Sequence, residues 1–295
     1  MCIAWYRCAA HPFCMQIAIV GPGAIGSTFA FQLSRAGHAV TVVARGARLQ
    51  QLLRDGAIVL VSGERATVTV AATLDTAIAY DLVLVTVLAP QVAAVLPALR
   101  HSAARKVMFM FNTFEPIDPM RGAVGAERFA FGFPGGVFVL LQAGRISPQI
   151  RRGTTVDDAS CAALFSSAGI ATVVDDDMQS WLRSHAAMVA PLMAIGVRVH
   201  ASGSGISWRE AKFHADAFYA GLRIVRAMGN DVRPRAIAMF EHLPRSFATW
   251  LLWMMSRTRM LRDLGALGSA EPRMLIDMMS RAAPGLAAPL AAIYP

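Results

Sequence analysis

The sequence predicts an α/β domain built on a mostly parallel sheet, followed by an all-helical domain. Over residues 15–177, short apolar and β-branched runs alternate with helical patterns, which is typical of parallel strands joined by crossover helices. From residue 178 onward only helical patterns occur, and the acidic run 175–177 supplies an N-cap for the first of these helices. We therefore expect domains at 15–177 and 178–295, with residues 1–14 as a poorly ordered extension.

The individual elements follow from these patterns in chain order. Strands are expected at residues 16–20, 39–43, 82–87, 107–111, 137–141, 154–156 and 171–174, of which 137–141 and 154–156 form an antiparallel stretch. Helices are expected at 27–36, 90–99, 159–168, from 178, at 208–228 and at 234–257.

Composition limits the classes of function. The chain has 295 residues, of which 55% are hydrophobic, but it contains no apolar run of about 18 residues, so we expect no membrane span. The net charge of +9 comes mainly from scattered arginines, which argues against a nucleic-acid partner. The four cysteines have no zinc-site spacing, so we expect no metal site. Their distribution is typical of a reducing, cytoplasmic compartment.

The motif GPGAIG lies between the first predicted strand and the first predicted helix. In this G-x-G-x-x-G pattern, Gly21 permits the turn, Gly23 lets the backbone approach a pyrophosphate, and Gly26 allows the helix to pack on the strand. The helix N-terminus that follows offers free N–H groups and a partial positive charge to phosphates, so Ala24 and Ile25 of the motif are expected to bind the cofactor together with the three glycines. The motif therefore predicts a dinucleotide-binding domain of the Rossmann type; a plain structural turn is the alternative.

The residues after the second strand indicate which nicotinamide cofactor binds. An NAD site places Asp or Glu there for the ribose 2′-hydroxyl, whereas this chain has Arg45, with Arg48 one turn further on. A guanidinium pairs with a 2′-phosphate through charge-assisted hydrogen bonds. We therefore expect NADP(H), and a solvated surface arginine is the alternative for Arg45.

Several segments resemble the ketopantoate reductase (2-dehydropantoate 2-reductase) superfamily from Met15 to the C-terminus. They are MQIAIVGPGAIGSTFAFQLSRAGHAVTVVAR, DLVLVTVLAPQV, FNTFEP, FPGGVF and DDDMQSWLR. The resemblance implies an NADPH-binding domain and a helical domain, with a 2-keto acid reduced between them. It also implies that Val87, Leu88 and Asn112 lie at the cofactor and that Glu271 contacts the substrate.

The departures from the family pattern concern its catalytic groups. Ser184, with His185 beside it, stands where the resemblance implies a catalytic lysine; Met188 replaces an asparagine, and Leu88 a second lysine. We therefore expect an oxidoreductase whose small, fairly apolar substrate is a carbonyl or imine compound other than ketopantoate. His185 is the leading proton donor because its ordinary pKa of ~6.5 suits neutral pH, Ser184 is the second candidate, and Asn112 orients the carbonyl.

Alternatives remain for the key residue and for the whole protein. His185 could be a structural histidine, because neighbouring helix residues point ~100° apart. The protein could also hold NADP(H) without redox turnover, as an isomerase, a cyclase or a dinucleotide-responsive binding protein. Apolar residues near Trp250 are consistent with core packing or with a homodimer formed through the helical domain.

Overall fold

A computed structural model describes residues 14–295, so most of the expected extension at 1–14 lies outside the described residues. The chain divides into two compact units. We call the part up to Phe111 together with Ile117–Met178 the sheet unit, and Asn112–Pro116 together with Gln179–Pro295 the helical unit. The boundary expected after residue 177 lies next to the division at Met178, whereas the transfer of Asn112–Pro116 to the helical unit was not anticipated.

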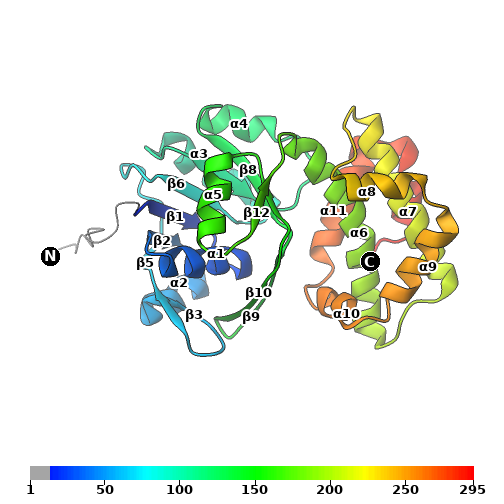
Figure 1. The fold of residues 1–295 in the computed structure, drawn as a ribbon, viewed down its shortest axis with the longest axis horizontal. Coiled ribbons are helices and arrows are strands. Elements are labelled where there is room, and N and C mark those ends of the chain that lie inside the picture. The colour runs from blue at the N-terminus through cyan, green and yellow to red at the C-terminus, as the bar shows by residue number, and fades with distance from the viewer. Residues whose placement is uncertain (1–13) are drawn as a thin grey trace. The chain divides into compact units, whose positions relative to one another are not determined.

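The sheet unit is built on eight strands in the order β12-β11-β8-β7-β6-β1-β2-β5 (Figure 1). Their bounds are β1 Gln16–Val20, β2 Ala39–Val43, β5 Thr69–Ala71, β6 Leu82–Val85, β7 Val107–Met110, β8 Phe129–Pro134, β11 Thr154–Val156 and β12 Thr172–Val174. Neighbouring strands are parallel, except that β11 pairs antiparallel with β8. The expected mostly parallel sheet is therefore confirmed, with β1 between β2 and β6 at its centre.

Helices and two small antiparallel sheets complete the sheet unit. The helices are α1 Ala24–Arg35, α2 Gly46–Asp55, the 3₁₀ turn η1 Ala89–Gln91, α3 Val92–His101, α4 Asp118–Val124 and α5 Ala159–Ser167. The small sheets pair β3 Ala57–Val59 with β4 Arg65–Thr67, and β9 Val137–Gln142 with β10 Arg145–Ile150. The sequence patterns did not reveal α2, β3, β4, β5, α4, β8 or β10, most of which are short or strongly polar.

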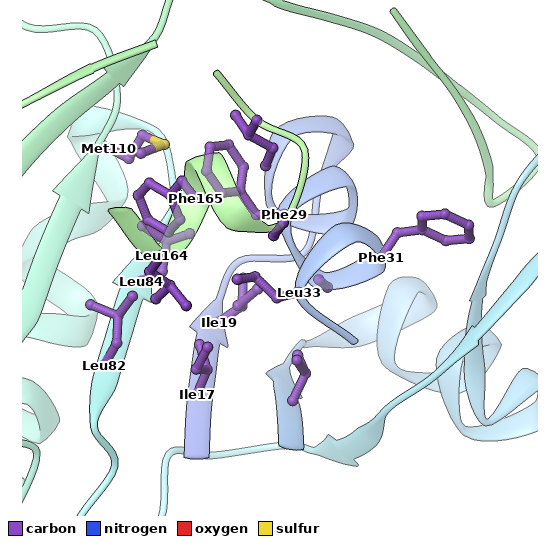
Figure 2. Close-up of a cluster of buried hydrophobic side chains, with 14 of the residues drawn as sticks. Ile17, Ile19, Phe29, Phe31, Leu33, Leu82, Leu84, Met110, Leu164 and Phe165 are labelled. Carbon is purple, nitrogen blue, oxygen red and sulfur yellow. The ribbon is translucent and has the colours of Figure 1, made fainter. Parts of the chain in front are cut away.

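The core of the sheet unit holds β1 and α1 in place. Ile17 and Ile19 of β1 are fully buried, and Phe29 of α1 meets Phe165 of α5 edge-on with ring centroids 4.9 Å apart (Figure 2). Phe31 points away from that contact on another side of α1, so this helix is apolar on more than one side (Figure 2). The loop that joins β1 to α1 is therefore supported at both ends by buried elements.

The helical unit contains α6 Met178–Ser202, α7 Trp208–Ala227, α8 Arg235–Ala238, the 3₁₀ turn η2 Met239–His242, α9 Arg245–Met255, α10 Arg259–Gly265, α11 Ala270–Ala282, the 3₁₀ turn η3 Pro284–Leu286 and α12 Ala288–Ala291 (Figure 1). Close packing of α6 depends on small residues, since a Cβ on Gly221 of α7 would come within 2.9 Å of the Cβ of Ala187. None of the described helices is both long enough and apolar enough to traverse a bilayer.

One predicted helix was wrong. The pattern over 234–257 indicates a single helix, but the chain breaks it into α8, η2 and α9. Pro244 causes the last break, because proline pushes the residue before it out of the helical region, and Leu243 is extended with φ −80° and ψ 145°.

Candidate functional site

The glycine-rich loop between β1 and α1 has the geometry that its sequence predicts. Gly21 has φ +90°, and a Cβ there would lie 2.7 Å from Cγ1 of Val87. A Cβ on Gly26 would collide with Oγ1 of Thr86, whereas a Cβ on Gly23 would have no atom within 4 Å. Gly21 and Gly26 are therefore required by packing, and Gly23 faces open space where a ligand can approach the backbone.

The start of α1 offers donors at this open surface. Gly23 is the N-cap, and the first helical bond runs from the Ser27 N–H to the Gly23 carbonyl at 3.0 Å. The N–H groups of Ala24, Ile25 and Gly26 consequently have no acceptor within the helix. This donor set and the open face at Gly23 fit the pyrophosphate of a dinucleotide.

Side chains that the sequence motif does not include fix the carbonyl groups of the loop. Thr86, directly after β6, donates to the Gly21 carbonyl at 2.8 Å. The Ser27 hydroxyl and Nε of Arg48 both donate to the Pro22 carbonyl at 2.9 Å. Arg48 thus contacts the loop itself, whereas the sequence suggested it only as a second partner for a 2′-phosphate.

The other predicted cofactor residues of the sheet unit lie at the ends of β2 and β6. Arg45 is exposed and serves as the N-cap residue of α2, two residues after the end of β2. Val87 is buried against Gly21, and Leu88, which is 57% exposed, precedes η1. Arg45 is therefore accessible to a ligand, and Leu88 offers only apolar surface where the resemblance implies an amine.

In the helical unit, two predicted site residues are directly paired. Nδ2 of Asn112 donates to Oε1 of Glu271 at 2.5 Å, although 159 residues separate them along the chain. Oδ1 of Asn112 is buried and has no hydrogen-bond partner among the described residues. A buried acceptor without a donor is costly, so this oxygen is suited to an N–H or O–H group of a ligand.

His185 lies on α6, half-buried, with its ring stacked on the indole of Trp181 at 5.1 Å and an interplanar angle of 7°. Burial lowers the pKa of His185 to about 4, so the imidazole is neutral at pH 7. Met188 follows one turn later and is also partly exposed. The accessible face of α6 at this point therefore carries a neutral imidazole and an apolar thioether.

Ser184 lies on a different face of the same helix. It is fully buried, its hydroxyl donates to the Ser180 carbonyl at 2.8 Å, and it accepts the N–H of Arg233 at 3.0 Å. The expected catalytic contact requires an accessible hydroxyl, which Ser184 does not have in this conformation. Its observed partners give it a structural role, since it ties α6 to the chain before α8.

Arg183 is a residue of interest that the sequence analysis missed. Its side chain is almost completely buried, donates to the Phe114 carbonyl at 3.1 Å and to Oδ1 of Asn230 at 2.5 Å, and lies over the Phe114 ring. Because Phe114 follows Asn112 closely, Arg183 holds the chain that carries Asn112 on α6. The available signal in the sequence was an arginine that lies one residue after the apolar pair Trp181 and Leu182 in the predicted helix.

The parallel sheet, the glycine-rich loop and its free helix start define a dinucleotide-binding protein of the Rossmann class. Within that class, residues 17–158 match the sequence profile of the family described as ketopantoate reductase PanE/ApbA, which is the family that the sequence motifs resemble. The match supports an NAD(P)-dependent oxidoreductase. No curated protein sequence matches the chain.

Solved structures with the same fold extend over both units. A PanE/ApbA family ketopantoate reductase from Ralstonia eutropha JMP134 has a TM-score of 0.71 at 19% identity, covering 95% of this chain and 96% of that one. D-mandelate dehydrogenase with NADH and anilino(oxo)acetate has a TM-score of 0.67 at 16% identity, covering 95% of this chain and 98% of that one. A dimeric ketopantoate reductase from Staphylococcus aureus has a TM-score of 0.64 at 14% identity, covering 95% of this chain and 96% of that one. At such identities the likeness establishes the fold alone.

Proposed function

We propose that the protein is an NADPH-dependent oxidoreductase that reduces a carbonyl or imine substrate other than ketopantoate. The observation that carries the proposal is the open glycine-rich loop with an exposed Arg45 at the end of the neighbouring strand. The N–H groups of Ala24, Ile25 and Gly26 would hold the pyrophosphate, and Arg45 the 2′-phosphate. NADPH, when bound, supplies the hydride.

The nicotinamide half of the cofactor and the substrate would be held by Val87, Leu88, Asn112 and Glu271. The partnerless Oδ1 of Asn112 supports this assignment, because it needs a donor from outside the described residues. Glu271 fixes the orientation of the Asn112 amide through its bond to Nδ2.

His185 would act on the substrate as a neutral hydrogen-bond donor. With a pKa of about 4, it carries almost no transferable imidazolium proton at pH 7, but a neutral imidazole N–H can still polarise a carbonyl or imine. The proton that completes the reduction would then come from water. Met188, one turn along α6, gives the substrate an apolar neighbour and supports a substrate less polar than ketopantoate.

The test is the disappearance of NADPH absorbance with a panel of 2-keto acids, ketones and cyclic imines, with ketopantoate as the comparison substrate. We expect turnover with at least one apolar member and little with ketopantoate. Efficient ketopantoate reduction would contradict the proposed substrate class, and binding of NADPH without turnover on any member would contradict the proposed reaction.

A second candidate is a protein that holds NADP(H) without redox turnover, as an isomerase, a cyclase or a binding protein. It is favoured by one observation, namely that the two proposed proton donors are a histidine with a depressed pKa and a buried serine. In that case NADPH would bind with unchanged affinity in the presence of a substrate that is rearranged, and its absorbance would stay constant.

We also propose a homodimer that forms through the helical unit. Phe247, Trp250 and Met254 are 42%, 44% and 42% exposed and follow one face of α9 at helical spacing. Light scattering should give twice the mass of the chain, and Trp250→Glu should give the monomer mass. A monomeric wild-type protein would contradict the proposal.

A further inference from the structure

Arg48 is the centre of a hydrogen-bond network that joins α2 to the glycine-rich loop. Every nitrogen of its guanidinium donates to a protein acceptor. Nε donates to the Pro22 carbonyl at 2.9 Å, Nη2 to the Ser27 hydroxyl at 2.7 Å, and Nη1 to the Gly144 carbonyl at 2.9 Å and to Gln51 at 2.6 Å. The side chain is only partly exposed, so this network is part of the fold of the sheet unit.

Arg48, Ser27 and Pro22 form a closed triangle. Ser27 donates to the same Pro22 carbonyl that accepts from Arg48, and Ser27 in turn accepts from Arg48. Two donors on one carbonyl fix the orientation of the peptide plane between Pro22 and Gly23. That peptide leads directly to the open backbone at Gly23, where a pyrophosphate would approach.

The same guanidinium connects the loop to the β9–β10 hairpin. Its acceptor Gly144 lies in the hairpin turn, where Ala143 and Gly144 have φ of +46° and +80°. A planar fork can satisfy acceptors on α2, the glycine-rich loop and the hairpin at once, whereas a lysine ammonium on a flexible stem cannot reproduce this geometry.

We propose that Arg48 is a positioning residue that sets the glycine-rich loop for the pyrophosphate shared by NADPH and NADH, and that Arg45 alone discriminates the 2′-phosphate. This inference rests on the proposed function. Its reason is that the Arg48 nitrogens are all directed to protein acceptors, while Arg45 is exposed at the start of α2. The two arginines should consequently differ in which nucleotide they affect.

The experiment measures dissociation constants for NADPH and NADH by fluorescence titration of the full chain. Arg48→Lys and Arg48→Met should weaken the binding of both nucleotides by the same factor, about tenfold. Lysine keeps the charge but cannot make the forked set of hydrogen bonds, and methionine keeps neither. Arg45→Ala should weaken NADPH alone. Arg54→Ala is the matched control, since Arg54 is an exposed arginine on the same helix, and it should leave both affinities unchanged.

Ser27→Ala keeps the test informative if the Arg48 variants fold poorly. It removes the second donor to Pro22 with little change in volume, and it should also weaken both nucleotides equally. In the double variant Ser27→Ala/Arg48→Lys, the factor by which the dissociation constant rises should be smaller than the product of the two single-variant factors. The reason is that both side chains donate to the same carbonyl, that of Pro22.

Three results would overturn the inference. Selective loss of NADPH affinity in Arg48→Lys would make Arg48 a 2′-phosphate ligand. Unchanged affinity for both nucleotides, with a lower thermal midpoint, would make it a purely structural residue. Both results leave the proposed function intact, whereas a wild-type chain that binds neither nucleotide would overturn the proposed function and this inference together.

Discussion

Nδ2 of Asn112 lies 2.5 Å from Oε1 of Glu271, and this bond joins the segment Asn112–Pro116 to the first turn of α11 within the helical unit. A carboxylate that accepts from an amide N–H makes a stronger bond than a neutral acceptor does. The bond fixes which way the Asn112 amide points, and it leaves the carbonyl oxygen of that amide directed away from Glu271. One of the two predicted site residues therefore determines what the other can recognise.

The Asn112–Glu271 bond should be measurable as a coupling. Asn112→Ala and Glu271→Ala should each lower the free energy of unfolding by about 1–3 kcal/mol, because each leaves a polar partner unsatisfied. In the double variant, the loss of unfolding free energy measured by urea titration should be smaller than the sum of the losses in the two single variants. Additive losses would show that the bond does not form in solution, and Arg273→Ala, an exposed change on α11, serves as the control.

The choice of nicotinamide cofactor should depend on Arg45. Arg45→Ala should weaken NADPH binding by ~1.5–3 kcal/mol and leave NADH nearly unchanged, since only NADPH carries the 2′-phosphate. Equal affinity of the wild type for the two cofactors, measured by titration, would disprove the NADP(H) preference.

Gly23 and Gly26 should respond differently to added side chains. Gly23→Val should abolish dinucleotide binding and preserve the thermal midpoint, because a Cβ there meets no protein atom within 4 Å. Gly26→Ala should lower the midpoint, because its Cβ would collide with Thr86 and the Gly21 carbonyl. Calorimetry with and without NADPH separates the two effects, and tight NADPH binding by Gly23→Val would make the loop a plain turn.

The role of His185 should appear in its pH dependence. If the neutral imidazole is the active form, kcat should be independent of pH from about 5.5 to 8 and fall only as the pH approaches 4. His185→Phe retains a ring that can stack on Trp181 and should lower kcat by ~10²–10⁴ without changing NADPH affinity. A kcat that falls as the pH rises, with an apparent pKa near 6.5, would instead identify an imidazolium donor.

His214 should make the helical unit sensitive to acid. It is 7% exposed, and burial lowers its pKa to about 4 from an ordinary 6.5. Between pH 4 and 6.5 this imidazole is protonated in the unfolded chain but neutral in the folded protein. The free energy of unfolding therefore falls as the pH drops from 6.5 to 4, by at most about 3 kcal/mol.

His214→Phe should therefore reduce the difference in unfolding free energy between pH 7 and pH 4.5, measured by urea titration. Asp157, whose pKa burial raises to about 6, acts in the opposite direction in that range, but it contributes equally to both proteins. His200→Gln changes an exposed histidine and is the control. An unchanged pH difference in His214→Phe would contradict this account.

The sequence predicted what short-range patterns encode. Strand β1, the glycine-rich loop and the polar end of β2 at Arg45 follow from local residue types, since turn chemistry and apolar runs act within a few residues. The direction of Ser184 and the partners of Arg48 could not be predicted, because each depends on chain that is distant in sequence. The break at Pro244 could have been predicted, since proline disfavours a helical residue before it.

The assignment of Asn112–Pro116 to the helical unit has a consequence for how the protein can be re-engineered. The backbone changes unit after Phe111, after Pro116 and again after Met178, so no single cut separates the two parts. A fragment ending at Met178 would retain Phe114, a side chain that is 1% exposed, without Arg183 to cover it. A chimera that replaces the helical unit by that of another protein must therefore exchange two separate segments of the gene, those that encode residues 112–116 and 179–295.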